Sequence, residues 1–250
     1  MISAIIITKN EENNIASCLE SIKWVDEIIV VDSGSTDRTE EICRQYTKNF
    51  YFNEWAGFGK QKQHAYDMAS NVWIFSIDAD EIVTEDLKCQ ILEKISSDNT
   101  SDGFYLPRLS YYLNKPIRHS GWYPDFNLRI VKKDKGFFSQ DLVHERLCIN
   151  GSFEFLDNPL LHFPFNSISS QIQKLDHYSS LSARDMQSKG KRISWSMLFL
   201  KTIYSFFRVY FLKMGFLDGW RGFLIAKNSS IFTFYKYLKL KELYLTGKLD

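Results

Sequence analysis

The chain has 250 residues, of which 44% are hydrophobic and 24% are charged, and its formal net charge is +1. This length fits one large domain or one domain with an appendage, and the composition excludes disorder as the general state. The four cysteines form no CxxC pair and are too sparse for a disulfide scaffold, which favours a reducing compartment. The first apolar run is too short for the core of a signal peptide, so we expect the chain to stay in the cytoplasm.

Strands and helices alternate through the first third of the sequence. Continuous apolar runs predict four strands, at 2–7, 27–31, 48–52 and 72–77. Capping residues and helical spacing predict helices between them, over 13–22, 37–46 and 60–70. This alternation favours an α/β fold with a largely parallel sheet that is flanked by helices. Ligands of such sheets bind beyond the carboxyl ends of the strands, where Thr8, Asp32 and Asp78 would lie.

The turns after these strands exclude two common nucleotide-binding motifs. The first turn has no glycine, which excludes the GxGxxG fingerprint of dinucleotide-binding domains, and no GxxxxGK[ST] sequence occurs that would form a P-loop. The fourth strand instead ends in a DxD motif, Asp78-Ala79-Asp80. Phosphatases of the haloacid-dehalogenase type also carry DxD, but after the first strand of their core, which makes them the weaker alternative.

Three segments resemble, in order and spacing, the family 2 inverting glycosyltransferases of GT-A fold. They are IIITKNEENNIASCLESI (5–22), EIIVVDSGSTDRT (27–39) and WIFSIDADE (73–81). The later segments GFGKQKQ (57–63), GWYPDFNLRIVKK (121–133) and LVHE (142–145), together with the basic aromatic C-terminus, are similar to the lipopolysaccharide inner-core glycosyltransferases. That subgroup transfers glucose in β-1,4 linkage to a core heptose. The resemblance implies a GT-A catalytic domain over 1–165, with donor binding in 1–100 and acceptor binding and the base in 101–165.

The resemblance also implies a metal site beside a nucleotide-sugar donor. A departing nucleoside diphosphate gains negative charge, and a divalent cation that prefers oxygen ligands, Mg²⁺ or Mn²⁺, would neutralise it. Asp80 is expected to bind this metal directly, while Asp78 meets the ribose or the water shell of the metal. His144 would complete the metal shell or contact the pyrophosphate. The alternative is that Asp78, Asp80 and Glu81 only cap the helix that begins near Thr84.

Three further residues match the donor site of the family. Asp32 corresponds to the carboxylate that accepts a hydrogen bond from uracil, and Thr8 and Glu11 line the base and ribose. Asp32 could equally close its own turn. Lys62 lies in a helix that enters from a glycine-containing loop, where cations and free amides favour phosphate, although lysines on helices are usually only solvated.

An inverting transferase needs a base that takes the proton from the attacking acceptor hydroxyl. Asp125, ahead of Leu128-Arg129, is the first choice by resemblance, and Glu145 is the second. A surface turn after Pro124 is the alternative account of Asp125. The stretch 105–135 carries seven cations and two acids, which suits an anionic acceptor. We expect Arg118, Trp122 and Arg129 to bind that acceptor, a lipid-linked oligosaccharide.

The C-terminal region differs from the rest in charge and in aromatic content. Residues 184–250 carry 13 cations and 4 acids, while 195–244 hold 15 of the 39 aromatic residues. No uncharged run in 195–226 exceeds eight residues, far fewer than the roughly 20 that span a bilayer. We therefore expect 166–250 to be a helical, membrane-associating region of a peripheral protein, on the cytoplasmic face of the inner membrane. A buried aromatic helix pair is the alternative, and the acidic donor half argues against nucleic acid.

Together these patterns predict an inverting, metal-dependent enzyme that moves a hexose, preferably glucose, from a UDP-sugar to a heptose of the lipopolysaccharide inner core. Two alternatives remain open. One is a UDP-hexose transferase for another lipid-linked or surface glycan acceptor. The other is a non-catalytic, membrane-bound protein that only binds UDP-sugar.

Overall fold

The computed structural model describes residues 1–97, 101–139, 146–165 and 167–247. It divides into two compact units. The first, which we call the sheet unit, comprises 1–109 and 124–163, and the second, the helical unit, comprises 110–123 and 164–250. The sequence predicted a division at 165/166, and the structure divides the chain after Phe163 and also assigns the segment 110–123 to the helical unit.

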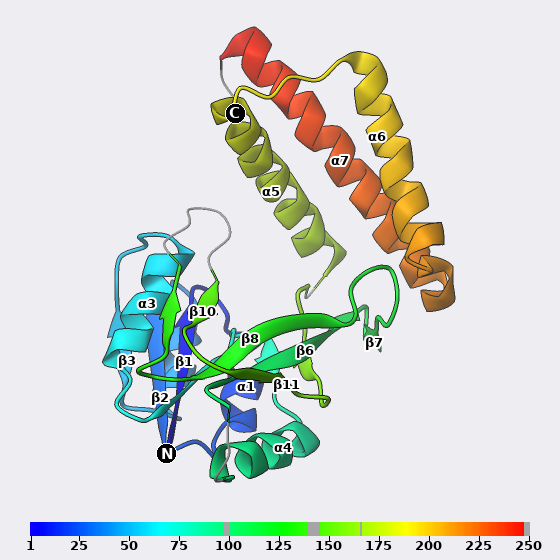
Figure 1. Cartoon of the computed structure of the whole chain (residues 1–250). Helices are drawn as coiled ribbons and strands as arrows, with labels where there is room; N and C mark the ends of the chain where they lie inside the picture. Colours follow the sequence, from blue (N-terminus) through cyan, green and yellow to red (C-terminus); the bar gives the residue numbers. More distant parts are fainter. Residues whose placement is uncertain (98–100, 140–145, 166, 248–250) are drawn as a thin grey trace. The chain divides into compact units, whose positions relative to one another are not determined.

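The main sheet follows the order β3-β2-β1-β4-β8-β6-β12-β5. Figure 1 labels β3, β2, β1, β8 and β6 among these strands. The first four strands in this order are parallel, and β8 runs antiparallel between β4 and β6. The strands along this path are β1 (Ile2–Thr8), β2 (Glu27–Asp32), β3 (Phe50–Phe52), β4 (Trp73–Ser76), β5 (Glu81–Ile82), β6 (Gly103–Tyr112), β8 (Asp125–Lys132) and β12 (Leu160–His162). The remaining short strands are β7 (Lys115–Pro116), β9 (Gly136–Phe138), β10 (Leu147–Ile149) and β11 (Phe153–Phe155).

Helices cover both faces of the parallel strands because successive side chains of a strand point to opposite faces. Ile2, Ala4 and Ile6 of β1 belong to one buried cluster, which includes residues of α1 and α4. Ile5, between them, belongs to a second cluster with residues of α3. The helices of this unit are α1 (Ile15–Ser21), α2 (Thr39–Cys43), α3 (Phe58–Met68) and α4 (Glu85–Ser96). The predicted mostly parallel, helix-flanked sheet is thus confirmed.

The start of α4 bears on the DxD motif. Thr84 is the N-cap of this helix, and its hydroxyl accepts a hydrogen bond from the backbone N–H of Leu87 at 3.2 Å. A threonine cap of this kind satisfies one of the amides that a helix start leaves unpaired. The cap is therefore supplied by Thr84, and not by the side chains of Asp78 or Asp80.

The helical unit contains the predicted C-terminal helices and a hairpin formed by the end of β6 and β7. Its helices are α5 (Ile168–Ser188), α6 (Trp195–Phe207), the π-helical turn η1 (Arg208–Leu212), the 3₁₀ turn η2 (Gly215–Asp218) and α7 (Trp220–Thr246). Tyr112 and Ile117 of the hairpin are buried with Val209, Ile225 and Ala226. Among the described helices, none is both long enough and apolar enough to cross a membrane.

One buried carboxylate holds this hairpin within its unit, and a close contact between two glycines joins η2 to α7. Buried Asp218 accepts hydrogen bonds from the backbone N–H groups of Arg118 and His119 and from the hydroxyl of Ser120, the last at 2.7 Å. Gly222 lies so close to Gly215 that a β-carbon at 222 would be 1.7 Å from the carbonyl oxygen of Gly215. A side chain at 222 would therefore force η2 away from α7.

Candidate active site

The carboxyl ends of β1 and β2 lie side by side, as a parallel sheet requires. Thr8 and Asp32 are paired in register, and both are buried. Asp32 closes the turn after β2, because its Oδ2 accepts hydrogen bonds from the backbone N–H groups of Gly34 and Ser35 at 2.7 Å. The alternative that the sequence left open, that Asp32 closes its own turn, is therefore present in the structure. The hydroxyl of Thr8 is buried and has no hydrogen-bond partner in the described part of the chain.

The loop after β1 is tied to the loop after β2. The backbone N–H of Glu11 donates to the hydroxyl of Thr39, and the N–H of Asn10 donates to that of Ser35, both at 2.8 Å. The Glu11 carboxylate accepts a hydrogen bond from the side-chain amide of Asn14 at 2.8 Å. Asn10 has a φ of 56°, which asparagine tolerates better than most residues. The two predicted donor loops therefore form one hydrogen-bonded surface.

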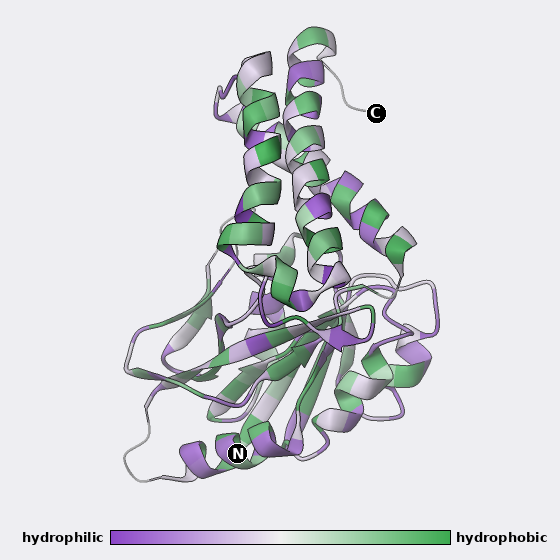
Figure 2. Cartoon of the chain, turned by 90° about the vertical axis from the view of Figure 1, so that its right-hand side faces the viewer, coloured by the Kyte–Doolittle hydropathy of each residue, from purple (hydrophilic) through white to green (hydrophobic). Residues whose placement is uncertain are grey.

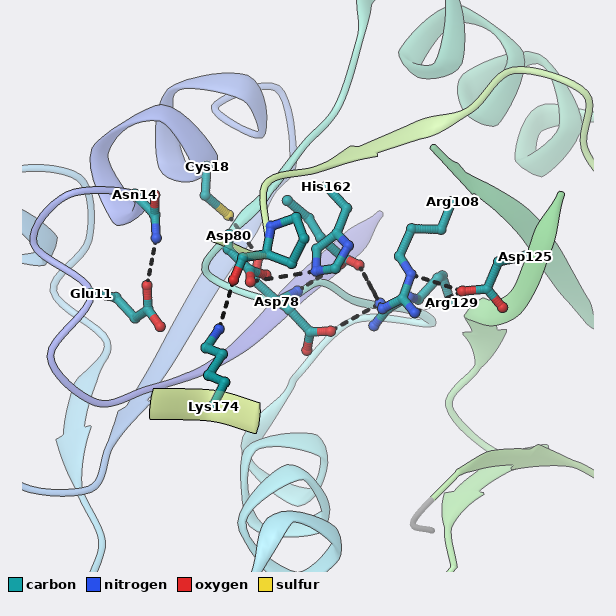
Figure 3. A network of polar contacts seen from close by, with 12 residues as sticks. Glu11, Asn14, Cys18, Asp78, Asp80, Arg108, Asp125, Arg129, His162 and Lys174 are labelled. Atoms are coloured by element: carbon teal, nitrogen blue, oxygen red, sulfur yellow. Dashed lines mark hydrogen bonds and ion pairs between the residues drawn. The ribbon is translucent and has the colours of Figure 1, made fainter. Parts of the chain in front are cut away.

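Asp78 lies between two cations, Lys62 and Arg129. Figure 3 shows its contact with Arg129. Its Oδ1 is 2.7 Å from Nζ of Lys62 on α3, and its Oδ2 is 2.9 Å from Nη2 of Arg129 on β8. Burial alone would raise the pKa of Asp78, but the charges of Arg129 and Lys62 outweigh burial and hold the pKa well below its ordinary value. Asp78 is therefore an anion, and Lys62, predicted to meet phosphate, is paired with this carboxylate.

Glu81 is the buried neighbour of this ion pair, with 0% of its surface exposed. Its carboxylate accepts hydrogen bonds from Nη2 of Arg129 and from the backbone N–H of Asp78. Burial raises the pKa of Glu81 to about 6, because Arg129 only partly offsets the loss of water around the carboxylate. The sequence predicted no role for Glu81 other than the alternative of capping α4, and Thr84 supplies that cap.

Asp80 has a histidine beside it that the sequence analysis missed. The strand β12 pairs with β5, and this brings Nε2 of His162 to 3.4 Å from Oδ2 of Asp80. The resemblance had led us to expect a histidine downstream of the DxD, and His144 was chosen because a glutamate adjoins it. His144 and Glu145 lie outside the described residues. Only the pairing of two short strands, which carry no sequence motif, reveals His162.

Asp125 opens β8, and 41% of its side chain is exposed. Its Oδ2 accepts two hydrogen bonds from Arg108 on the neighbouring strand β6, from Nε at 3.0 Å and from Nη2 at 2.7 Å. The partner Arg108 was not predicted, although it stands in the basic stretch that the sequence analysis singled out. Asp125 is therefore part of a strand, and not of the surface turn that was the alternative.

The three predicted acceptor residues have different surroundings. Arg118 is exposed, with its guanidinium 5.9 Å from the centre of the Tyr123 ring. Trp122 is half-buried against Tyr112 and Phe165. Arg129 is only 6% exposed and is bound to Asp78 and Glu81, so its place differs from that expected of an acceptor ligand.

A divalent cation fits the Asp80 end of the site better than the Asp78 end. Both carboxylate oxygens of Asp78 already face cations, whereas Asp80 and His162 place an oxygen and a nitrogen ligand side by side. Within the described ranges, no group of three or more side chains is arranged to hold a metal. Magnesium commonly takes only one or two protein carboxylates and completes its shell with substrate phosphates and water.

Comparisons with known proteins decide the family. The model of Glycosyl transferase family 2 matches residues 3–152. The chain belongs to this family. An uncharacterized glycosyltransferase of Rickettsia felis is 33% identical over 97% of this chain and 89% of its own length. The lipopolysaccharide core biosynthesis glycosyltransferase LpsC of Rhizobium meliloti is 31% identical, over 96% of this chain and 92% of its own length.

The family-2 protein is therefore a glycosyltransferase, and the predicted enzyme class and GT-A fold are confirmed. Among solved structures, S. aureus TarS residues 1–349 with UDP-GlcNAc aligns over 99% of this chain and 92% of that one, with 15% identity and a TM-score of 0.49.

Proposed function

We propose that this family-2 enzyme transfers a hexose, preferably glucose, from a UDP-sugar. The observation that carries the proposal is the arrangement at the end of β4, where Asp78 faces Lys62 and Asp80 adjoins His162. The unpartnered, buried hydroxyl of Thr8 supports a ligand at the same edge of the sheet, because buried hydroxyl groups ordinarily have a partner. Asp32 and Glu11 would border the uracil and ribose.

The metal site of this proposal consists of Asp80 and His162. A bound Mg²⁺ or Mn²⁺ would supply Lewis-acid assistance to the departure of the nucleoside diphosphate. Lys62 is the cation that can move from Asp78 to the donor phosphates, since its ammonium is a flexible point charge. His162 takes the place that the sequence analysis had given to His144.

Asp125 is the proposed general base, with Glu145 as the second candidate. The geometry favours Asp125 in one respect: both hydrogen bonds from Arg108 go to Oδ2, and the carboxylate is partly exposed. Its other oxygen, Oδ1, is then available to take the proton of an acceptor hydroxyl during in-line attack. Inversion at the anomeric carbon follows from such a single displacement.

The proposed acceptor is a heptose of the lipopolysaccharide inner core, and the similarity to LpsC supports this class of acceptor. A lipid-linked acceptor requires an enzyme that works at a membrane surface. The helical unit exposes large apolar side chains along α6, η1, η2 and the start of α7. Figure 2, which colours the ribbon by hydropathy, shows many hydrophobic residues in green along the long helices. Exposed Lys201, Arg208 and Lys213 lie among them, which suits a peripheral contact with anionic lipid.

Calorimetric titration tests the donor site. UDP-glucose, UDP-galactose, UDP-N-acetylglucosamine and GDP-mannose are each titrated into the protein with Mn²⁺ and with chelator. We expect binding of one UDP-sugar, dependent on Mn²⁺ and lost in Asp80→Ala and His162→Ala. Binding that is as tight with chelator as with Mn²⁺ would refute the metal site. Binding of donor without turnover, with lipopolysaccharide core present, would favour the non-catalytic alternative.

A further inference from the structure

Six charged side chains of the sheet unit form one continuous series, which we call the charge chain. In spatial order its members alternate in sign: Lys62, Asp78, Arg129, Glu81, Arg108 and Asp125. Neighbours in this order are in salt-bridge contact, and the longest separation is 3.9 Å, between Nη1 of Arg108 and Oε1 of Glu81. Figure 3 shows the chain running from the DxD motif toward Asp125.

Glu81 is the point at which the two halves of this series meet. Its Oε1 accepts the hydrogen bond from Arg129 and is also the oxygen that Arg108 approaches. Arg129 in turn holds Asp78, and Arg108 holds Asp125. One buried carboxylate therefore lies between the guanidinium groups that orient a donor-side carboxylate and the proposed base.

The strands explain why the spacing is fixed. Asp125 opens β8, and Arg129 lies farther along the same strand, at the β-bulge where the pairing with β6 passes from Leu128 to Ile130. Arg108 is the register partner of Asp125 on β6. Two antiparallel strands thus carry the two arginines, and the contacts with Glu81 bring both guanidinium groups to one carboxylate.

Stability alone does not account for a buried carboxylate here. Removing a carboxylate and two arginines from water is costly, and apolar residues of similar size often stabilise a core at least as well. We infer that Glu81 is a positioning residue of the transfer reaction, which holds Arg129 on Asp78 and Arg108 on Asp125 so that donor and acceptor sites keep a fixed separation. This inference rests on the function proposed above.

The test uses Glu81→Gln and Arg108→Lys, singly and combined. Steady-state kinetics are measured with UDP-glucose and a deacylated, heptose-terminated lipopolysaccharide core. We expect Glu81→Gln to lower kcat by about 10–100-fold and to raise the KM for both substrates, because both arginines lose their shared counter-charge. In the double variant we expect an effect on kcat/KM well below the product of the single effects, since the two residues act through one contact.

Glu154→Gln is the matched control. Glu154 lies in the same unit and pairs with Lys94 at 2.7 Å, outside the charge chain, so it should leave kcat and both KM values unchanged. A purely structural role for Glu81 would reduce the folded fraction and hence kcat while leaving both KM values as they are, and that result would overturn the inference. Multiplicative effects of Glu81→Gln and Arg108→Lys would overturn it as well.

Asp80→Ala separates this inference from the proposed function. If Asp80→Ala is inactive while Glu81→Gln and Arg108→Lys behave like Glu154→Gln, the inference fails and the proposed function stands. If Asp80→Ala keeps full activity, the proposed function fails, and the inference falls with it. Should Glu81→Gln not fold, Arg108→Lys alone decides the case: a raised KM for the core acceptor supports positioning, and an unchanged KM contradicts it.

Discussion

The sheet unit and the helical unit depart from ordinary burial in opposite directions. In the sheet unit charges are buried, as with Glu81 and Arg129. In the helical unit large apolar side chains are exposed, as with Leu200 at 63% and Ile203 at 67%. Buried charges persist where they are paired, and exposed apolar patches mark surfaces that meet a partner. The contrast separates a unit that buries paired charges from a unit that presents an apolar surface.

Asp125→Asn is the substitution with the largest expected effect. Asparagine keeps the shape and can still accept from Arg108, but it cannot take a proton, so turnover should fall by about 10²–10⁴-fold. Calorimetry should show donor binding within a few-fold of wild type. The matched control is Asp134→Asn, an exposed aspartate outside the charge chain, which should retain full rate. Full activity of Asp125→Asn combined with loss in Glu145→Gln would transfer the role of base to Glu145.

The exposed face of α6 is expected to give the next largest effect. Replacing Phe199, Leu200 and Ile203 together by serine removes three apolar side chains that are each more than half exposed. This change should weaken binding to phosphatidylglycerol-containing vesicles by about 100-fold. Vesicle co-sedimentation measures this, while UDP-glucose hydrolysis should remain at the wild-type rate. Val72→Ser, an exposed apolar site of the sheet unit, is the control and should bind vesicles as wild type does. Undiminished vesicle binding by the triple variant would refute the contact role of this face.

Asp218→Asn tests a buried acid in the helical unit that serves the fold alone. Its carboxylate accepts hydrogen bonds from two backbone N–H groups and from the hydroxyl of Ser120. The side-chain amide of asparagine would place an N–H donor against one of these donors. We expect a loss of about 2 kcal/mol in the free energy of unfolding. Chemical denaturation measures the loss, and kcat corrected for the folded fraction should not change in UDP-glucose hydrolysis. A stability equal to that of wild type would mean that the hairpin is held by its apolar contacts alone.

The smallest expected effect concerns Asp102, which Lys132 and the backbone N–H of Ser152 bind at 2.8 and 3.0 Å. The hydrogen bond from Lys132 lowers the pKa of Asp102 to about 2. A carboxylate with a lowered pKa stabilises the fold above its unfolded pKa, and this contribution disappears as the pH falls toward 2. Asp102→Asn should therefore be less stable than wild type at pH 7, and the difference should shrink between pH 4 and 2. A difference that stays constant down to pH 3 would contradict this account.

The strands of the sheet unit were predictable because buried parallel strands require continuous apolar runs, and β1, β2 and β4 have them. The convergence of Thr8, Asp32 and Asp78 followed from the same parallel order. By contrast, the contacts of His162, Glu81 and Arg108 depend on strand pairing, between β5 and β12, which are distant in the sequence, and between β6 and β8. Neither pairing leaves a local pattern, so the sequence did not predict His162 beside Asp80 or the ion pairs that Glu81 and Arg108 form.

In the helical unit, too, the sequence predicted the helices but not the contacts between segments that are distant in the chain. The abundance of aromatic residues and cations in 195–244 predicted interfacial helices, and α6 and α7 occupy that stretch. Nothing local in 110–123 indicates that this hairpin belongs with helices a hundred residues later. The deciding contacts are those of Tyr112 and Ile117 with Val209 and Ile225, and such contacts appear only in three dimensions.

This hairpin has a consequence for how the protein is made. Tyr112 and Ile117 leave the ribosome more than 80 residues before Val209 and Ile225, the residues that cover them. At translation rates of about 5–20 residues per second, the two apolar side chains remain uncovered for several seconds. A chain that ended after Phe163 would lack Val209 and Ile225, the residues that cover these two side chains. Such a fragment is expected to need a chaperone or to aggregate, so the donor site is best produced and assayed in the full-length protein.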